Sequence, residues 1–281
     1  MKIIINHVTV EYDKNLPNYS KALDDISLVI NEGDFLGIAG HTGSGKSTLI
    51  QLMNGLIKPS KGNVYFEGED IFEKRYDRKT LRGKVGLLFQ YPEHQLFAET
   101  VFEDVCFGPL NIGFDRKAAE LSAYDALKSV GMPDDLFYQS PFNMSGGQMR
   151  RAALAGILAM KPEVLILDEP TAGLDPGAQQ SILGIIKKLH EEKKITIVLV
   201  SHNMDDIAEY TDRMIVLNKG RKVLDGLTKD VFMERDILKE AGLSVPQVTG
   251  LCGMLNKKGF PINQDLIRYE DVKRELLNIL K

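Results

Sequence analysis

The chain has 281 residues, enough for one large α/β domain and a small appendage. Its formal net charge is −4, so no overall basic field attracts nucleic acid or anionic lipid, and we expect no nucleic-acid partner. No apolar stretch approaches the roughly 20 residues of a membrane helix, and the first residues become polar too early for a signal peptide. A role at a membrane would therefore require another chain to hold this protein there.

The first part of the chain predicts strands around a glycine-rich loop. Residues 2–12 alternate as a strand does, and 23–30 is predicted to be a second strand after a polar, hairpin-like break at 15–22. Residues 35–39 read as a buried strand and 47–56 as a helix. The loop between them matches the pattern G-x-x-x-x-G-K-[ST], in the strand-to-helix context where that pattern binds phosphate. Its residues are Gly40, His41, Thr42, Gly43, Ser44, Gly45, Lys46, Ser47 and Thr48.

The composition of this loop suits a triphosphate. Glycines let successive backbone N–H groups turn inward, and the helix that follows adds the positive end of its dipole. Lys46 is expected to reach the β- and γ-phosphates, the Ser47 hydroxyl to bind Mg²⁺, and Thr48 to donate to a phosphate further back. The alternative is a chance match, which has a frequency of about one in a hundred in a chain of this length. A dinucleotide fingerprint fits poorly, because Thr48 stands where its third glycine would be.

Two residues outside the loop have the position and chemistry to meet a nucleotide. Tyr12 ends the first strand, where an aromatic ring can stack on a base; the alternative is an ordinary strand-end aromatic. Gln90 follows a predicted strand at 84–89, and the ends of such strands converge on bound nucleotide. Its amide oxygen could contact Mg²⁺ or a water and so sense the γ-phosphate. The alternative is a solvated polar residue.

The middle of the chain changes from strands to helices. Residues 101–107 and 115–130 have helical spacing and are interpreted as a helical insertion packed by its apolar stripe. Ser145 is predicted to cap a helical run at 149–160, and Gly146 and Gly147 would leave bare N–H groups at that helix start. This pattern indicates a second anion site. Taken alone, it could equally be a simple cap.

Two further predicted strands end in polar side chains. The strand at 164–169 ends in Asp168 and Glu169, and buried carboxylates suggest a cation and water. Asp168 is predicted to hold the metal and Glu169 to polarise the attacking water. The strand at 195–200 leads to His202, which could donate to a γ-phosphate oxygen, although a lone histidine is more often structural. Asp175 lies in a loop before a predicted helix at 178–189.

The rest of the chain carries no further chemical motif. A hairpin is predicted at 212–224, and residues 228–281 have helical spacing interrupted at Gly242, Pro246 and 259–261. The final apolar stripe is too short to form a core of its own, so we expect it to cover its own domain or to meet a partner. Its residues are Val272, Leu276, Ile279 and Leu280.

Taken in this order, the motifs resemble the nucleotide-binding subunit of ATP-binding-cassette (ABC) transporters over roughly residues 2–240. The matching pieces are residues 40–47, Gln90, 145–148, 165–169, 173–175 and His202. The resemblance implies an α/β fold: a P-loop NTPase cassette at 1–240, with a RecA-like core, an antiparallel β-subdomain and a helical subdomain at about 95–160. Residues 241–281 would form a small C-terminal helical appendage and a probable dimer contact.

The same resemblance implies roles for the site residues, with ATP and Mg²⁺ as cofactors. Lys46, Gln90, Glu169 and His202 would form the catalytic set, with Gln90 as the transmission glutamine and His202 as the switch. Tyr12 would stack on the base, and Asp175 would be the D-loop acid. The Mg²⁺ set would be Ser47, Gln90 and Asp168. The signature that closes on ATP held by the partner would be Ser145, Gly146, Gly147 and Gln148. Two ATP molecules would lie between subunits of a head-to-tail dimer, with homodimer and heterodimer both open.

A narrower resemblance is to the ATPases of energy-coupling factor transporters, which take up vitamins or transition-metal ions. It rests on residues 90–97, 100–101, 107–111, Asp104 and Met149. Ala172 and Gly173 depart from the serine and alanine of many cassette proteins. The resemblance implies a peripheral protein at the cytoplasmic face of the cell membrane. Its partners would be a second ATPase subunit, an integral membrane coupling subunit and a substrate-binding membrane subunit.

One segment of the chain is expected to dock the membrane subunit. Residues 91–111 follow Gln90 directly and contain a density of apolar groups that is unusual for a loop. The side chains expected to be exposed are Tyr91, His94, Leu96 and Phe97. The alternative is that they pack into the helical insertion.

Two other protein classes share parts of this motif set. A soluble cassette ATPase that acts on DNA or ribosomes usually carries a long coiled coil, a second cassette or basic arms, and this sequence contains none of them. A P-loop kinase would not need residues 145–148 or His202. The sequence therefore favours the ATPase subunit of a membrane importer.

Overall fold

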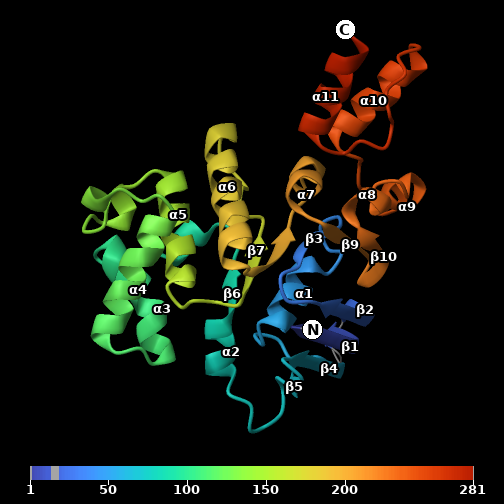
Figure 1. The fold of residues 1–281 in the computed structure, drawn as a ribbon. Coiled ribbons are helices and arrows are strands. Elements are labelled where there is room, and N and C mark those ends of the chain that lie inside the picture. The colour runs from blue at the N-terminus through green and yellow to red at the C-terminus, as the bar shows by residue number, and fades with distance from the viewer. Residues whose placement is uncertain (1, 14–18, 281) are drawn as a thin grey trace.

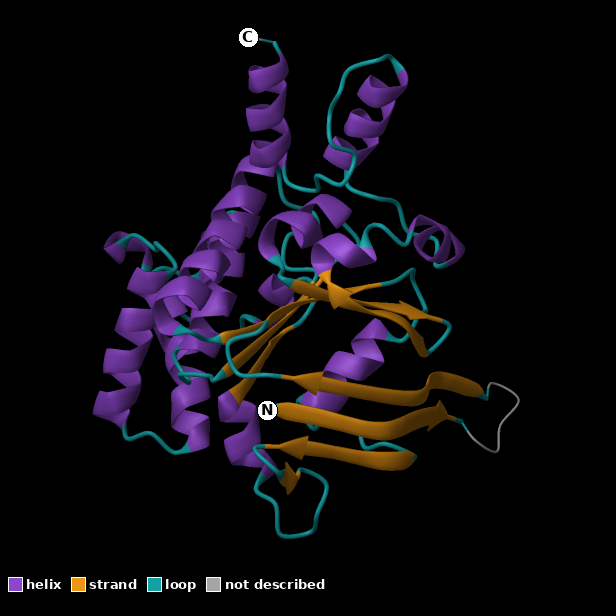
Figure 2. Cartoon of the chain, turned by 45° about the vertical axis from the view of Figure 1, so that its right-hand side comes forward, coloured by secondary structure: helices purple, strands orange, loops and turns teal. Residues whose placement is uncertain are grey.

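The computed structural model describes residues 2–13 and 19–280, and the fold is built on two sheets (Figures 1 and 2). The smaller sheet is antiparallel and has the order β2-β1-β4-β5. Its strands are β1 (Ile3–Tyr12), β2 (Ser20–Ile30), β4 (Lys61–Phe66) and β5 (Glu69–Asp70). The larger sheet has the order β10-β9-β3-β8-β7-β6 and is parallel except for β10. Its strands are β3 (Phe35–Ala39), β6 (Val85–Leu88), β7 (Val164–Asp168), β8 (Thr196–Val200), β9 (Arg213–Asn218) and β10 (Arg221–Leu227).

The inner strands of the larger sheet are apolar along their length because both faces are covered. In β7, Leu165 and Leu167 pack into the core shared with the helical side of the molecule. Val164 and Ile166 point the other way, into a core shared with α1 (Lys46–Met53) and the smaller sheet. Each fully buried aliphatic side chain contributes about 1.5–3 kcal/mol. The alternation therefore sandwiches the larger sheet between two cores.

Helices cover the larger sheet and extend beyond its β6 edge (Figure 1). The helices between the sheet strands are α2 (Arg78–Lys84), α6 (Pro176–Lys193) and α7 (Met204–Tyr210). The helical subdomain contains α3 (Val101–Ile112), α4 (Arg116–Ser129) and α5 (Gly146–Leu158), with short 3₁₀ turns η1 (Pro92–Gln95), η2 (Asp134–Leu136) and η3 (Pro141–Asn143). Side-chain caps start α3, α4 and α5; in α4, Asp115 accepts a hydrogen bond from the Ala118 N–H at 2.8 Å. The α/β cassette fold expected from the sequence is confirmed.

Four parallel strands end at the same edge of the larger sheet. The loops that follow β3, β6, β7 and β8 begin at residues 40, 89, 169 and 201. In an open parallel sheet, ligands bind in the crevice outside these carboxyl ends. The fold therefore brings the four polar motifs of the sequence to one place.

The C-terminal segment forms a small helical unit at the far end of the molecule, near the label C in Figure 1. Its helices are α10 (Gln247–Lys257) and α11 (Tyr269–Ile279). The preceding α8 (Thr228–Val231) and α9 (Arg235–Glu240) pack on the main core instead, through Val231, Phe232 and Leu238. Cys252, Ile262 and Val272 form a small core between α10 and α11. As expected, the final stripe does not form a core alone, but it packs on α10 of the same segment, a partner that the sequence did not suggest. Leu280 lies outside this core and is exposed.

Several element boundaries differ from the sequence prediction. The predicted break at 15–22 lies partly outside the described residues, and Ser20–Ala22 already belong to β2. The helix predicted to end at 107 continues to Ile112 although it contains Pro109, and it ends at Gly113 in a left-handed conformation. The short helices α2 and α7 were missed. Within the described ranges, no helix is both long and apolar enough to cross a membrane.

Candidate functional site

The loop between β3 and α1 has the backbone geometry of a phosphate cradle. Gly43 and Gly45 have φ angles of 80° and 104°, and a Cβ on Gly45 would lie 2.5 Å from the Ala22 carbonyl oxygen. The Lys46 Nζ curls back over the loop and donates to the carbonyl oxygens of Gly40 and His41 at 2.6 and 3.1 Å. Burial lowers the pKa of Lys46, and the nearby Glu169 and Asp168 oppose this effect. An anion bound in the loop would likewise stabilise the charged form of Lys46.

The loop opens into a pocket of about 890 Å³, within the size range of sites for small ligands. Its lining residues are Tyr12, Ser20, Lys21, Ala22, Gly40, His41, Thr42, Gly43, Gly45, Lys46, Ser47, Thr48, Gln90, Asp168, Glu169, His202, Gly242, Leu243 and Ser244. The residues predicted from the sequence to meet nucleotide in this chain are thus assembled, with one exception. The Ser44 side chain is buried beneath the loop, and its Oγ has no hydrogen-bond partner among the described residues.

One end of the pocket has donors that suit Mg²⁺. The Ser47 Oγ donates to Asp168 Oδ2 at 3.5 Å, close to the roughly 3 Å that separates neighbouring ligands of an octahedral Mg²⁺. Burial raises the pKa of Asp168, and the adjacent Glu169 adds to this, while Lys46 opposes it. Within the described ranges, no three acidic, histidine or cysteine side chains cluster as a metal site. A hydroxyl and one carboxylate are typical of Mg²⁺ that arrives with phosphate oxygens.

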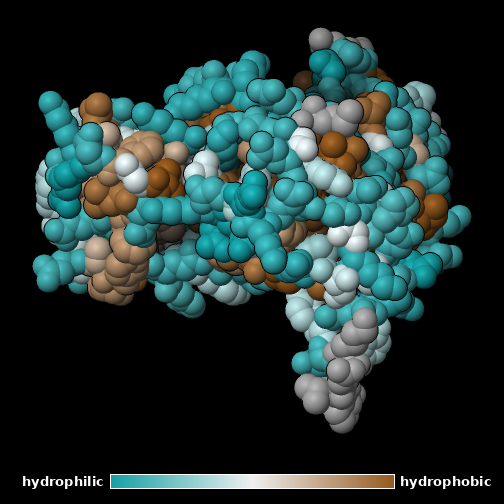
Figure 3. All heavy atoms as spheres, turned by 90° about the horizontal axis from the view of Figure 1, so that it is seen from below, coloured by the Kyte–Doolittle hydropathy of each residue, from teal (hydrophilic) through white to brown (hydrophobic). Residues whose placement is uncertain are grey.

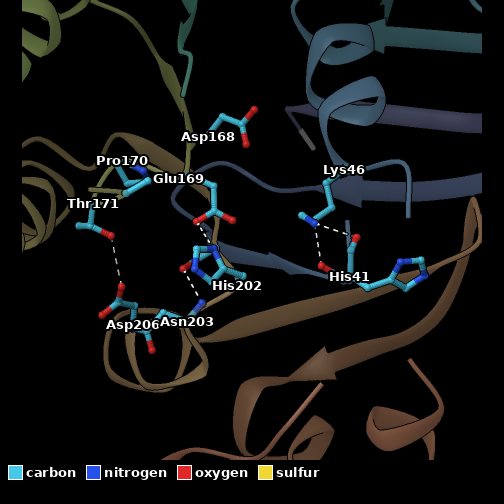
Figure 4. A network of polar contacts seen from close by, with 12 residues as sticks. His41, Lys46, Asp168, Glu169, Pro170, Thr171, His202, Asn203 and Asp206 are labelled. Carbon is cyan, nitrogen blue, oxygen red and sulfur yellow. Dashed lines mark hydrogen bonds and ion pairs between the residues drawn. The ribbon is translucent and has the colours of Figure 1, made fainter. Parts of the chain in front are cut away.

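Glu169 and His202 meet beside this end of the pocket (Figure 4). The His202 Nδ1 lies 2.7 Å from Glu169 Oε2, and the imidazole is otherwise 72% exposed. Glu169 has a φ angle of 50°, and its N–H donates to the Val200 carbonyl oxygen at 3.0 Å. The unusual backbone conformation turns the carboxylate toward the histidine. An acid poised by a histidine at the end of a phosphate pocket can orient a water and accept its proton.

Tyr12 and Gln90 stand at the rim of the pocket. The Tyr12 Oη lies 3.4 Å from Thr48 Oγ1, and the ring is partly exposed on the outer side of the loop. Gln90 is exposed and lines the pocket near Asp168 and Glu169. Both positions are compatible with the predicted contacts to a base and to the terminal phosphate.

The second glycine-rich turn lies elsewhere in the chain. Ser145 caps α5 by a capping box: its Oγ accepts from the Gln148 N–H at 3.3 Å, and Gln148 Oε1 accepts from the Ser145 N–H at 2.9 Å. Ser145, Gly146 and Gly147 share a separate pocket of about 310 Å³ with Asp175. Asp175 caps α6, where its Oδ1 accepts from the Ala178 N–H at 3.0 Å. This pocket and the phosphate pocket have no lining residue in common.

The segment after Gln90 corrects one expectation. Leu96 is only 8% exposed because it packs into the core of the helical subdomain, so it does not belong to an exposed apolar surface. Phe97 and Phe107 are exposed instead, and their rings meet edge to face at 4.9 Å. Figure 3 shows apolar side chains gathered at the end of the molecule formed by the helical subdomain.

Sequence reasoning missed several residues of this region. Lys21 and residues 242–244 line the pocket from β2 and from the approach to α10, and no local pattern marks them. Arg150 is buried in α5, and Asp206 in α7 accepts from the Thr171 Oγ1 at 3.5 Å. A signal for Arg150 exists, because it is in phase with the core residues Leu154 and Leu158 of the same helix.

Comparison with known proteins agrees with this geometry. The family model described as ABC transporter matches residues 23–172. The energy-coupling factor transporter ATP-binding protein EcfA2 of Caldanaerobacter subterraneus subsp. tengcongensis is 50% identical over 281 residues, which cover 100% of this chain and 98% of the relative. The protein of the same name from Clostridium tetani is 48% identical, over 99% of this chain and 97% of the relative. The chain belongs to the ATP-binding proteins of energy-coupling factor transporters.

Solved structures of other ABC transporter ATPases share the fold. CbiO1 from Clostridium perfringens, part of the ABC transporter complex CbiONQ, is 35% identical with a TM-score of 0.74, over 89% of this chain and 97% of that chain. The dimeric ATP-binding cassette MJ0796, bound to ADP and Pi in a post-hydrolysis state, is 29% identical with a TM-score of 0.71, over 80% of this chain and 98% of that chain. As an ABC transporter ATPase, the chain binds and hydrolyses ATP.

Proposed function

We propose that this chain is the ATPase subunit of an energy-coupling factor importer and powers uptake of a vitamin or a transition-metal ion. The observation that carries the proposal is one pocket that joins the phosphate loop to Asp168, Glu169 and His202, on a chain whose relatives, matched over almost their entire length, are energy-coupling factor ATPases. We infer that the protein lies peripherally at the cytoplasmic face of the membrane. Its partners there are a second ATPase subunit, a coupling subunit and a substrate-binding membrane subunit.

The pocket supports one assignment of roles. Lys46 and the loop N–H groups bind the phosphates, and Tyr12 stacks on the base. Ser47, Asp168 and Gln90 hold Mg²⁺, which when bound neutralises charge on the phosphate oxygens. Glu169 accepts a proton from the attacking water, and His202, which lies beside that carboxylate, donates toward the γ-phosphate when ATP is bound.

The second pocket supports a composite site made by two subunits. Residues 145–148 start a helix and expose N–H groups, yet this anion-binding end faces a pocket separate from the phosphate loop of its own chain. A head-to-tail dimer would place it on the ATP of the partner, with Asp175 beside it. We further propose that α10 and α11 extend this dimer contact, since Met254, Leu277 and Leu280 are exposed on them.

The docking surface for the membrane subunit is proposed at Phe97 and Phe107. Paired exposed rings on a cytoplasmic domain are suited to an apolar partner. Replacing both with serine should abolish co-purification with the membrane chains while ATP affinity stays within about twofold, because the substitutions lie outside the nucleotide pocket. Leu121→Ser, at an exposed leucine of α4, is the matched control. Unchanged co-purification and uptake by the double variant would contradict the docking role.

One experiment separates this proposal from a soluble cassette ATPase acting on DNA or ribosomes. The tagged chain is purified from detergent-solubilised native membranes, and the co-eluting proteins are identified by mass spectrometry. We expect two integral membrane chains and a second ATPase subunit. Recovery in the soluble fraction with ribosomal proteins or DNA would refute the transporter assignment.

A further inference from the structure

Two residues of the pocket region, Glu169 and Tyr91, have left-handed backbone conformations, which are unfavourable for residues with a side chain. Glu169 has a φ angle of 50°, and Tyr91, directly after Gln90, has a φ angle of 54°. For residues other than glycine, this left-handed conformation is unfavourable because the Cβ atom crowds the backbone. Such conformations persist only where neighbouring contacts hold the turn closed.

One side chain contacts both turns. Arg150 is 1% exposed, and its guanidinium lies between the loop after β7 and the 3₁₀ turn η1. Its Nη1 donates to the carbonyl oxygens of Pro170 and Ala172 at 3.1 and 2.7 Å. Its Nη2 donates to both carboxylate oxygens of Glu93 at 2.9 and 3.0 Å.

The Arg150 contacts lie next to the backbone hydrogen bonds that close the turns at Glu169 and Tyr91. The Ala172 N–H donates back to the Glu169 carbonyl oxygen at 3.1 Å, so the carbonyls held by Arg150 flank the turn that begins at Glu169. On the other side, Glu93 lies in η1, and the His94 N–H donates to the Tyr91 carbonyl oxygen at 3.1 Å. A guanidinium fits this arrangement because its planar donors serve a carboxylate and two carbonyls at once.

We propose that Arg150 is a positioning residue for hydrolysis: it holds the turns of Glu169 and Gln90 in register with the α5 helix that starts at Ser145. The proposal rests on the roles assigned above to Glu169 and Gln90. If the proposal holds, Glu169, Gln90 and the start of α5 move together as one unit. Misplacement of a reacting group by about 1 Å costs on the order of 100-fold in rate.

The competing explanation is that Arg150 only fills space and neutralises Glu93. Removing one member of a buried ion pair is strongly destabilising because the other charge is left alone, whereas removing both can be nearly neutral. The two explanations therefore predict different activities for a variant that lacks both the Arg150 and the Glu93 charge. A space-filling role predicts that activity returns with stability; a positioning role predicts that it does not, because the Pro170 and Ala172 carbonyls stay unheld.

The test uses the full chain, reconstituted with its complex, and compares Arg150→Met with Glu93→Gln/Arg150→Met. For Arg150→Met we expect a lower Tm, a kcat reduced by about 10- to 100-fold, and a KM for ATP within about twofold, because the phosphate loop is untouched. For the double variant we expect Tm to recover in part, since the Pro170 and Ala172 carbonyls still lack their donor, and kcat to stay low. Arg150→Lys keeps the charge and covers the case in which the methionine variant fails to fold; its kcat should also fall.

The controls assign each failure to its cause. Arg213 also donates to a carboxylate and a carbonyl, those of Asp225 and Val29, but far from the pocket, so Arg213→Met should lower Tm without lowering kcat. Glu169→Gln serves as the reference for the acid itself. If Glu169→Gln is inactive and kcat of the double Arg150 variant recovers with Tm, the positioning role is overturned alone. If Glu169→Gln is active, the function assigned to that residue fails first.

Discussion

Replacing Glu169 with glutamine isolates the charge of the acid from its shape. The amide can still accept from the His202 imidazole, which lies 2.7 Å from Oε2, so the local geometry should persist. The lost property is the ability to accept a proton from water. General-base catalysis is worth about 10²- to 10⁴-fold, so kcat should fall by that factor, equivalent to about 2.7–5.5 kcal/mol of barrier.

The same substitution should leave nucleotide binding intact or slightly tighter. The Glu169 charge raises the pKa of Asp168, so its removal makes Asp168 easier to ionise and to share with Mg²⁺. It also removes one negative charge beside the phosphates. The Kd for Mg-ATP should therefore equal or fall below that of the wild type, and the ATP-closed dimer should accumulate.

The measurement is steady-state phosphate release together with equilibrium binding of a fluorescent ATP analogue. Glu163→Gln is the matched control, since Glu163 stands at the opposite end of β7 and pairs with Lys2 and Lys84. Its kcat should stay within about twofold of wild type. A Glu169→Gln kcat within a few-fold of wild type would refute the role of the acid.

Three further predictions address other parts of the molecule. Ser145→Arg should abolish hydrolysis but leave the ATP affinity of the isolated subunit unchanged. In a homodimer, mixing the Ser145→Arg chain with a Lys46→Ala chain should restore one composite site. Loss of ATP binding by the Ser145→Arg chain would contradict action in trans. Burial raises the pKa of Asp206 from its ordinary 3.8 to about 6, aided by Asp205 and Glu169, so ionising it costs stability that grows between these two pH values and is fully present above about pH 6. Asp206→Asn should therefore increase the free energy of unfolding at pH 7.5 by up to about 2 kcal/mol after allowance for screening, seen as a higher Tm. The gain should vanish near pH 4, and a pH-independent gain would contradict this. Deleting 245–281 should shift the nucleotide-free protein toward monomer in sedimentation velocity; a lower monomer Tm without that shift would make the segment a cover for its own domain.

The nucleotide pocket could be predicted from sequence because each of its parts is local. A strand, a glycine-rich loop and a helix start lie within a few residues of Lys46, and Asp168 and Glu169 follow a run of apolar residues. Because β3 and β7 are parallel strands of one sheet, their carboxyl ends meet at the same edge, so no long-range contact has to be predicted. The short helices α2 and α7 were missed because one or two turns carry too little periodicity to stand out.

The contacts that hold the pocket could not be predicted in the same way. Arg150 and Glu93 are 57 positions apart, and nothing in either neighbourhood specifies the other. Leu96 and Phe97 are adjacent and both apolar, yet one is buried and one exposed, because the turn that follows η1 decides which faces the helical core. Such choices are made by tertiary packing.

The separation of the two anion-binding helix starts explains why one chain has two incomplete sites. Lys46 and the loop of α1 face the pocket with Glu169 and His202, whereas Ser145 at the start of α5 faces the pocket with Asp175. The Arg150 contacts tie α5, which begins after Ser145, to the loop that follows Glu169. If residues 145–148 bind a partner's ATP as proposed, a subunit that shifts this helix start would also shift its own acid. In the proposed head-to-tail dimer, closure of one composite site would then be communicated to the other through this buried side chain. A pair of identical pockets linked in this way would hydrolyse ATP only when both subunits close together.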